Sequence, residues 1–86
     1  MAEVKVGVVT HYFGNLNVAA IKLTDGELRV GDTIRVKGHT SDFQQKVESM
    51  QIEHQDVEVA EQGADIGIKV DEHAREHDEV FKVTEE

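Results

Sequence analysis

Two histidines four residues apart offer the clearest metal-ligand spacing in the chain. A helical turn over residues 71–77 would place His73 and His77 on one face, where both imidazoles could bind zinc or nickel. The segment H-A-R-E-H differs from the H-E-x-x-H pattern, because Glu76 adjoins the second histidine, and the spacing fixes no third ligand. We therefore predict no metal site and no cofactor, and keep a small metal-binding protein using this pair as an alternative.

His39, Ser41 and Asp42 supply the residue types of a hydrolase triad within four positions. Catalytic triads are assembled from separate elements whose side chains converge, whereas neighbouring loop residues diverge. We therefore predict a loop whose polar side chains bond their own backbone. The sequence predicts no catalytic residue and no enzyme activity.

Aromatic residues gather before a Gly-Asn turn, where a hairpin would end. Such rings can anchor a partner protein, or they can plug the mouth of a small barrel. If the loop is exposed, it is the preferred interaction site, together with two residues of a neighbouring connection. The predicted interaction loop consists of His11, Tyr12, Phe13, His39 and Phe43.

The composition limits the function classes. The chain has 86 residues, is 38% apolar and carries 18 acidic against 9 basic residues. This size and apolar content predict one domain over 1–86, with a core at about 4–83 and a frayed acidic tail at 84–86. The absence of cysteine excludes disulfides and thiol nucleophiles and favours the cytoplasm. No apolar run reaches about 20 residues and no signal peptide opens the chain, so we expect no membrane contact.

The net charge of -9 disfavours binding to phosphate backbones, and we predict no DNA partner. A local basic patch would still permit contact with RNA or the ribosome, which remains an alternative. Its members would be Lys5, Lys22, Arg35 and Lys37.

Short runs of alternating apolar residues predict six strands, over 4–8, 19–23, 33–37, 43–54, 66–70 and 81–83. The fourth run changes phase, so we expect a bulge or a sharp coil near Glu48 and Ser49. Residues 56–62 and 71–77 could each form one helical turn. Glycine turns and the absence of proline predict an all-β fold, a small closed six-stranded antiparallel β-barrel.

Two motifs carry a family resemblance. Residues 26–34 have the spacing G-x-L-x-x-G-D-x-I, and residues 47–68 contain V-x-S-(hydrophobic) followed by V-x-x-A-x-x-G-x-x-(hydrophobic)-G-(hydrophobic). This pattern resembles the second, β-barrel domain of translational GTPases such as the elongation factor Tu that delivers aminoacyl-tRNA, over about 4–83. The residues that define the fold motif are Gly26, Leu28, Gly31, Asp32, Gly63 and Gly67.

The segments V-T-H-Y-F at 9–13 and K-G-H-T at 37–40 are similar to those of stand-alone translation-factor-like proteins and of the C-terminal barrel of collagenase-like peptidases. The resemblance implies a non-enzymatic β-barrel binding module with a protein partner. No phosphate-binding loop is present, so GTP binding in cis is excluded. In the elongation factor this domain helps hold the aminoacyl end of tRNA, at positions that correspond to Ala20, Gln51 and Asp65. Ala20 offers no hydroxyl, so that function is not carried over.

Overall fold

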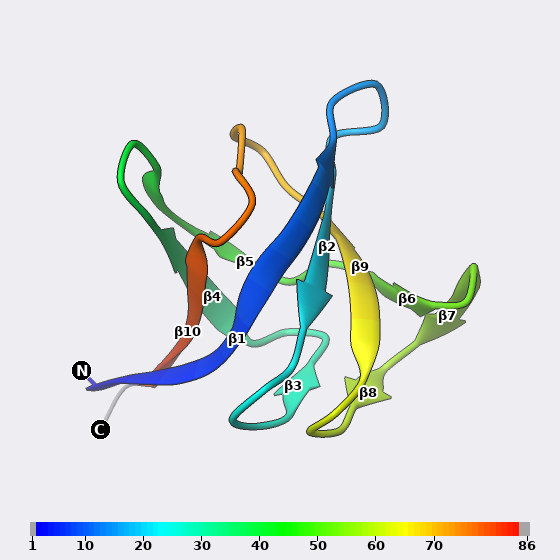
Figure 1. Cartoon of the computed structure of the whole chain (residues 1–86). Helices are drawn as coiled ribbons and strands as arrows, with labels where there is room; N and C mark the ends of the chain where they lie inside the picture. Colours follow the sequence, from blue (N-terminus) through cyan, green and yellow to red (C-terminus); the bar gives the residue numbers. More distant parts are fainter. Residues whose placement is uncertain (1, 85–86) are drawn as a thin grey trace.

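The computed structural model describes residues 2–84, which form ten strands and no helix (Figure 1). None of these residues belongs to a helix that could cross a membrane. The strands are β1 (Ala2–Phe13), β2 (Val18–Lys22), β3 (Leu28–Arg29), β4 (Thr33–Lys37), β5 (Asp42–Lys46), β6 (Met50–Ile52), β7 (Gln55–Val57), β8 (Val59–Ala60), β9 (Asp65–Lys69) and β10 (Glu79–Thr84).

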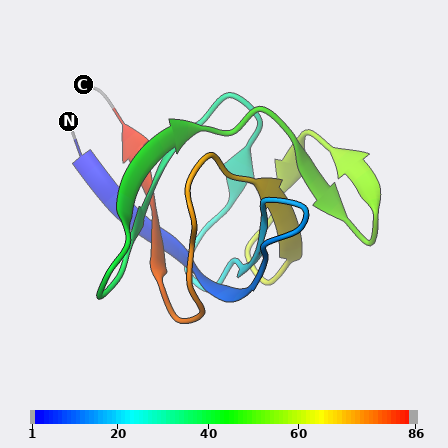
Figure 2. The ribbon, with the colours of Figure 1, turned by 90° about the horizontal axis from the view of Figure 1, so that it is seen from above.

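Eight strands form one antiparallel sheet in the order β5-β4-β10-β1-β2-β9-β6-β7, and β3 pairs with β8 in a second, two-stranded sheet. The large sheet curls around a common interior (Figure 2). Its end strands, β5 and β7, do not pair with each other. The Gln45 side chain instead links β5 to the end of β9, donating to the Lys69 carbonyl at 3.0 Å and accepting from the Asp71 amide at 2.8 Å. The all-β prediction is confirmed, but the structure has ten strands in two open sheets where the sequence predicted six in a closed barrel.

Alternation along each strand directs one set of side chains into a single core. On β2, Ala19 and Ile21 are buried, whereas Ala20 and Lys22 between and after them face outward. Each large apolar side chain contributes about 1.5–3 kcal/mol by leaving water. The largest fully buried side chains are Ile21, Leu23, Leu28, Ile34, Met50 and Ile68.

The first part of the predicted fold motif forms β3 and the turn that leads to β4, and its second part lies around β9. Leu28 is fully buried, and the Asp32 carboxylate accepts from the Arg29 amide at 2.9 Å. Gly31 has a φ of 99° and Gly63, in the turn before β9, has a φ of 96°, a backbone region that side chains rarely permit. Two of the motif's glycines are thus required by turn geometry.

The first predicted helical turn, over 56–62, is wrong. These residues form part of β7 and all of β8, and the Val30 amide donates to the Glu58 carbonyl at 2.9 Å. A helix of one or two turns is marginal in water, so pairing with β3 and β6 supplies the backbone with better partners.

The second predicted helical turn, over 71–77, is also wrong. The segment is an irregular connection between β9 and β10, held to β1 by a bond from the His77 amide to the Val9 carbonyl at 2.8 Å. Asp78 closes its last turn by accepting from the Arg75 amide at 2.9 Å. Main-chain bonds to a neighbouring strand replace those that a helix would have made.

Two further expectations concern the strand boundaries. The phase change near Glu48 and Ser49 is confirmed, because the chain leaves β5 and enters β6 there while Val47 and Met50 on either side are both buried. The predicted frayed tail began too early, since Thr84 pairs with Ala2 in the ladder of β10 and β1. Residues 85 and 86 lie outside the described part of the chain.

Candidate functional site

A groove lies on the outer face of four neighbouring strands. His11, Ala20, Gly67 and Gln51 are directly opposed, one each from β1, β2, β9 and β6. The two central positions carry almost no side chain, so the sheet surface is hollow between them. The resulting groove has a volume of about 330 Å³ and an apolar floor completed by Val18 and Ile66.

One wall of the groove comes from the hairpin that joins β1 and β2. Phe13 is 44% exposed and Leu16 is 64% exposed, although both are large apolar side chains. Leu16 lies in the turn itself, whose amide bonds back to the Phe13 carbonyl at 3.1 Å. The hairpin therefore holds two apolar side chains in solvent at the edge of an apolar floor.

The opposite wall comes from the two-residue turn between β6 and β7. Glu53 and His54 both have positive φ, 52° and 66°. Two consecutive positive φ values are those of a type I′ hairpin turn, which strongly favours Asn-Gly. A left-handed residue other than glycine costs roughly 1 kcal/mol. Asn-Gly would adopt this turn with less strain. The chain instead places two larger, ionisable side chains here, and both line the groove.

Polar groups around the groove are mainly acceptors. Gln51 Nε2 donates to Asp56 Oδ1 at 3.1 Å, which leaves the Gln51 carbonyl oxygen as the atom that can accept from a ligand. Asp65 lies on the rim and meets Lys22 Nζ at 3.5 Å, a long and exposed contact. Asp65 and Glu53 together give the groove a negatively charged rim around its apolar floor.

Comparison with known proteins places this fold in a family. The family model of elongation factor Tu domain 2 matches residues 17–79. The chain belongs to this family. The matched segment contains the floor and the polar rim of the groove, whereas Phe13 and Leu16 precede it.

Two curated relatives share this family's domain with the chain. An uncharacterized protease of Methanocaldococcus jannaschii is 37% identical over 84 residues, and a collagenase of Porphyromonas gingivalis is 38% identical over 81 residues. These alignments cover 96% and 93% of the chain but only 20% of each relative. The chain thus spans about one fifth of the length of the curated relatives it matches.

Crystal structures of the C-terminal domain of a Geobacillus thermoleovorans protein assigned to the U32 peptidases have the same fold. Two of them superimpose with TM-scores of 0.84 and 0.83 at 20% and 19% identity. They cover 92% and 88% of the chain, and 91% and 95% of the solved domains. The predicted likeness to both elongation factor Tu domain 2 and the C-terminal domain of collagenase-like peptidases is confirmed.

The family resemblance pointed to Ala20, Gln51 and Asp65, and the structure brings all three together in the groove. Leu16, Glu53 and His54 were missed. A leucine inside a Gly-Asn-Leu-Asn turn is a signal that could have been used, because turns favour polar residues. The Glu-His turn lacks the Asn-Gly signal of a type I′ hairpin.

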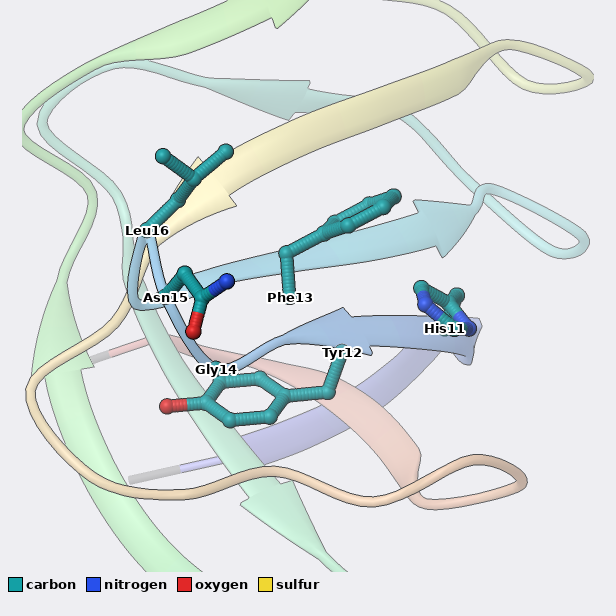
Figure 3. Close-up of a pocket in the computed structure, with 6 residues that line it drawn as sticks. All are labelled: His11, Tyr12, Phe13, Gly14, Asn15 and Leu16. Carbon is teal, nitrogen blue, oxygen red and sulfur yellow. The ribbon is translucent and has the colours of Figure 1, made fainter.

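The predicted interaction loop is divided by the structure. Tyr12 and Phe13 point to opposite sides of β1 (Figure 3). Tyr12 is half-buried against the core and packs on His73, with ring centroids 4.3 Å apart and the rings tilted by 44°, while Phe13 meets His11 edge-on with centroids 4.5 Å apart. Tyr12 therefore acts as the packing residue that the alternative interpretation expected, and Phe13 remains available to a ligand.

The other two members of that loop do not join it. Phe43 is 6% exposed and belongs to the core, so its assignment to an interaction surface is wrong. It faces inward because β5 pairs with β4 in the register that sets it opposite the buried Val36. His39 is exposed in the β4–β5 connection, and residues 71–78 separate that connection from the β1–β2 hairpin (Figures 1 and 2).

The histidine pair does not share a helical face. His73 packs on Tyr12, whereas His77 takes a φ of 74° in the turn before β10. His11 Nδ1 lies 3.2 Å from Glu76 Oε1, which docks this connection on β1. Within residues 2–84, no group of three or more histidine, aspartate or glutamate side chains could hold a metal ion.

The triad-like residues also fail to converge. Asp42 accepts two bonds from Arg35, at 2.8 and 2.9 Å, and the guanidinium lowers the pKa of this carboxyl. Ser41 is buried, and its carbonyl accepts from the Gly38 amide at 2.7 Å. The Asp42 carboxylate is thus oriented by Arg35.

Three of the four residues of the suggested RNA patch form ion pairs with carboxylates. Lys5 Nζ lies 3.3 Å from Glu79, and Arg35 also bonds Glu3 at 2.9 Å. Lys22 faces Asp65, as described, and Lys37 pairs across the ladder with Asp42. The phosphate backbone of an RNA would have to displace these carboxylates before it could pair with the same basic side chains.

Proposed function

We propose that this domain is a non-enzymatic protein-interaction module that binds its partner in the groove between the β1–β2 and β6–β7 hairpins. The observation that carries this proposal is the exposure of Phe13 and Leu16 beside an apolar floor, on a chain of net charge -9. Exposed apolar patches on small soluble domains commonly mark sites of association.

The construction of the groove supports a binding role over a catalytic one. Its floor is formed by ladder positions of a rigid sheet, so little conformational entropy is lost when a ligand binds. General acid–base chemistry would require an ionisable pair with separated pKa values in an enclosed site. The rim carboxylates here stand around an open groove.

The relatives support an accessory role. One is named a protease and another a collagenase, and the chain matches only about one fifth of each. A domain of this proportion, whose triad-like residues do not converge within residues 2–84, suits the holding of a polypeptide or of another domain. The family match covers the floor of the groove but not Phe13 and Leu16, which would adapt a shared scaffold to a particular partner.

A capture experiment tests this proposal. The tagged 86-residue chain is compared with Phe13→Ser plus Leu16→Ser in extracts, with and without nuclease. We expect one protein partner to be captured by the wild type, to resist nuclease and to be lost with the double variant. The matched control is Val4→Ser, which removes another exposed apolar side chain, 55% exposed and outside the groove.

Two results would contradict the proposal. Capture that both serine variants retain would show that the groove is not the binding surface. Capture that nuclease abolishes would assign the domain to RNA.

A further inference from the structure

We infer that the groove recognises a short extended peptide segment in which an apolar side chain lies two residues from an arginine or lysine, so that both face the groove. The inference rests on the proposed function and adds the chemistry of the ligand. The apolar side chain would lie against Phe13 and Leu16 over the floor formed by Ala20 and Gly67. The cationic side chain would cross the floor toward the acidic rim.

Charge complementarity selects a cation. Glu53 and Asp65 line the groove, and Asp56 lies beside it through its bond to Gln51. Lys22 contacts this rim through Asp65 at 3.5 Å, and the two side chains are 40% and 77% exposed. An arginine or lysine head could donate hydrogen bonds to the carboxylates of this rim while its alkyl stem covers the apolar floor. An acidic peptide or a phosphate backbone would meet like charge.

The dimensions of the groove select a short extended segment. The four strands that form it, β1, β2, β9 and β6, are neighbours in the sheet, so its outer strands are about 14 Å apart at roughly 4.8 Å per step. Four residues of extended peptide cover that distance at about 3.4 Å per residue. The volume of about 330 Å³ is near the lower limit for sites that enclose small molecules.

The left-handed turn gives an independent reason to assign a role to this end of the groove. Asn-Gly at Glu53 and His54 would relieve the strain at both positions, yet the chain carries a carboxylate and an imidazole there. Strained backbone conformations concentrate at functional sites. In this position the strain directs a carboxylate to the groove rim.

Nuclear magnetic resonance titration of the ¹⁵N-labelled 86-residue chain tests the inference. The probe is a capped hexapeptide of serine residues with leucine at its second position and arginine at its fourth, compared with one in which uncharged citrulline replaces the arginine. We expect the amides of Ala20, Gln51 and Gly67 to shift with the arginine peptide, and the citrulline peptide to bind at least about two-fold more weakly. A leucine–glutamate peptide is expected to leave these amides unshifted.

Charge variants locate the cation. Glu53→Gln plus Asp65→Asn should weaken binding of the arginine peptide roughly two- to five-fold for each carboxylate removed, the range for exposed ion pairs. The matched control is Glu79→Gln plus Asp42→Asn, which removes the same net charge from residues that pair with Lys5 and Arg35. We expect the control to change affinity by less than about two-fold.

Several outcomes would overturn the inference. Equal affinities for the arginine and citrulline peptides at the groove amides would remove the cationic requirement and leave the proposed interaction groove intact. Equal losses in the two double variants would show non-specific attraction to an acidic protein. Shifts with single-stranded oligouridylate but not with the arginine peptide would assign the groove to RNA. If no peptide shifts the groove amides, the inference fails, and the capture experiment judges the proposed function separately.

Discussion

The outer surface of the sheet has two faces of opposite character. The charge-paired face, over β4, β5, β10 and the start of β1, consists of Glu3, Lys5, Arg35, Asp42 and Glu79, joined in ion pairs of 2.8 to 3.3 Å. The groove face, over β2, β6, β9 and the end of β1, consists of Phe13, Leu16, Ala20, Gln51 and Gly67. Both faces belong to the same continuous sheet.

Folding alone does not account for this difference. Both halves of the sheet bury alternate residues in one core, which supplies the driving force for folding on each side. Outward side chains on the charge-paired face bind one another and are satisfied within the molecule. On the groove face, small residues and exposed rings leave a hollow that only a second molecule would fill.

The largest expected effect is a loss of stability from a substitution in β1, the strand that contributes to both faces. Gly7 pairs with Val80 of β10 beside the register shift in β1, one residue before the ladder with β2 begins at Val8. A Cβ there would overlap the Lys22 carbonyl oxygen and lie 3.2 Å from Ile21 Cγ2. Gly7→Ala should therefore lower the free energy of unfolding by about 3 kcal/mol, measured by urea denaturation.

Gly14→Ala is the matched control for that substitution. A Cβ at Gly14 has Tyr12 Cε2 at 3.8 Å as its nearest neighbour, an ordinary contact distance. We expect a change within about 0.5 kcal/mol. If Gly7→Ala proved equally harmless, the approach of the Lys22 carbonyl to Gly7 would not be what requires glycine at this position.

The second expected effect is an increase in the free energy of unfolding. Replacing Glu53 and His54 together by Asn and Gly should raise the free energy of unfolding by about 1 kcal/mol, because these residues accept positive φ at lower cost. The same variant should bind the leucine–arginine peptide more weakly, since a rim carboxylate is lost. Thermal denaturation and the peptide titration measure the two quantities. A destabilised variant would show that the turn is not strained.

Gly67→Ala should weaken peptide binding in the groove without changing the stability of the fold. A Cβ here would lie 3.4 Å from Val18 Cγ1, so a methyl group fits, unlike the one at Gly7. We expect stability within about 0.5 kcal/mol of the wild type and weaker peptide binding, because the methyl group fills the floor. Unchanged peptide affinity in a folded variant would show that the ligand does not reach the floor.

The strands that could be predicted are those with a complete alternation. The run at 33–37 became β4 with unchanged bounds, because Ile34 and Val36 alone fix its buried face. The strands β3, β7 and β8 have only two or three residues, too few to show a period, and they form because a partner strand is nearby.

The site could be predicted less completely than the fold. Ala20, Gln51 and Asp65 were indicated because family resemblance aligns positions that only folding brings together. Phe43 was misplaced because its exposure depends on the pairing register of β5, which its sequence neighbours do not reveal. The groove itself depends on which residues oppose one another across four strands.

The smallest expected effect lies on the charge-paired face. Bonds from Arg35 lower the pKa of Asp42 below its ordinary value, so the pair stabilises the fold above about pH 4 and this contribution is lost as the pH falls through the lowered pKa. Asp42→Asn should therefore reduce the thermal midpoint slightly at neutral pH, and the difference from wild type should vanish in acid. Asp42 is exposed and Arg35 is partly exposed, so solvent screening keeps the effect small. The titration of leucine–arginine peptide should be unchanged in this variant, whereas a loss comparable to that of Asp65→Asn would mean that the two faces do not act separately.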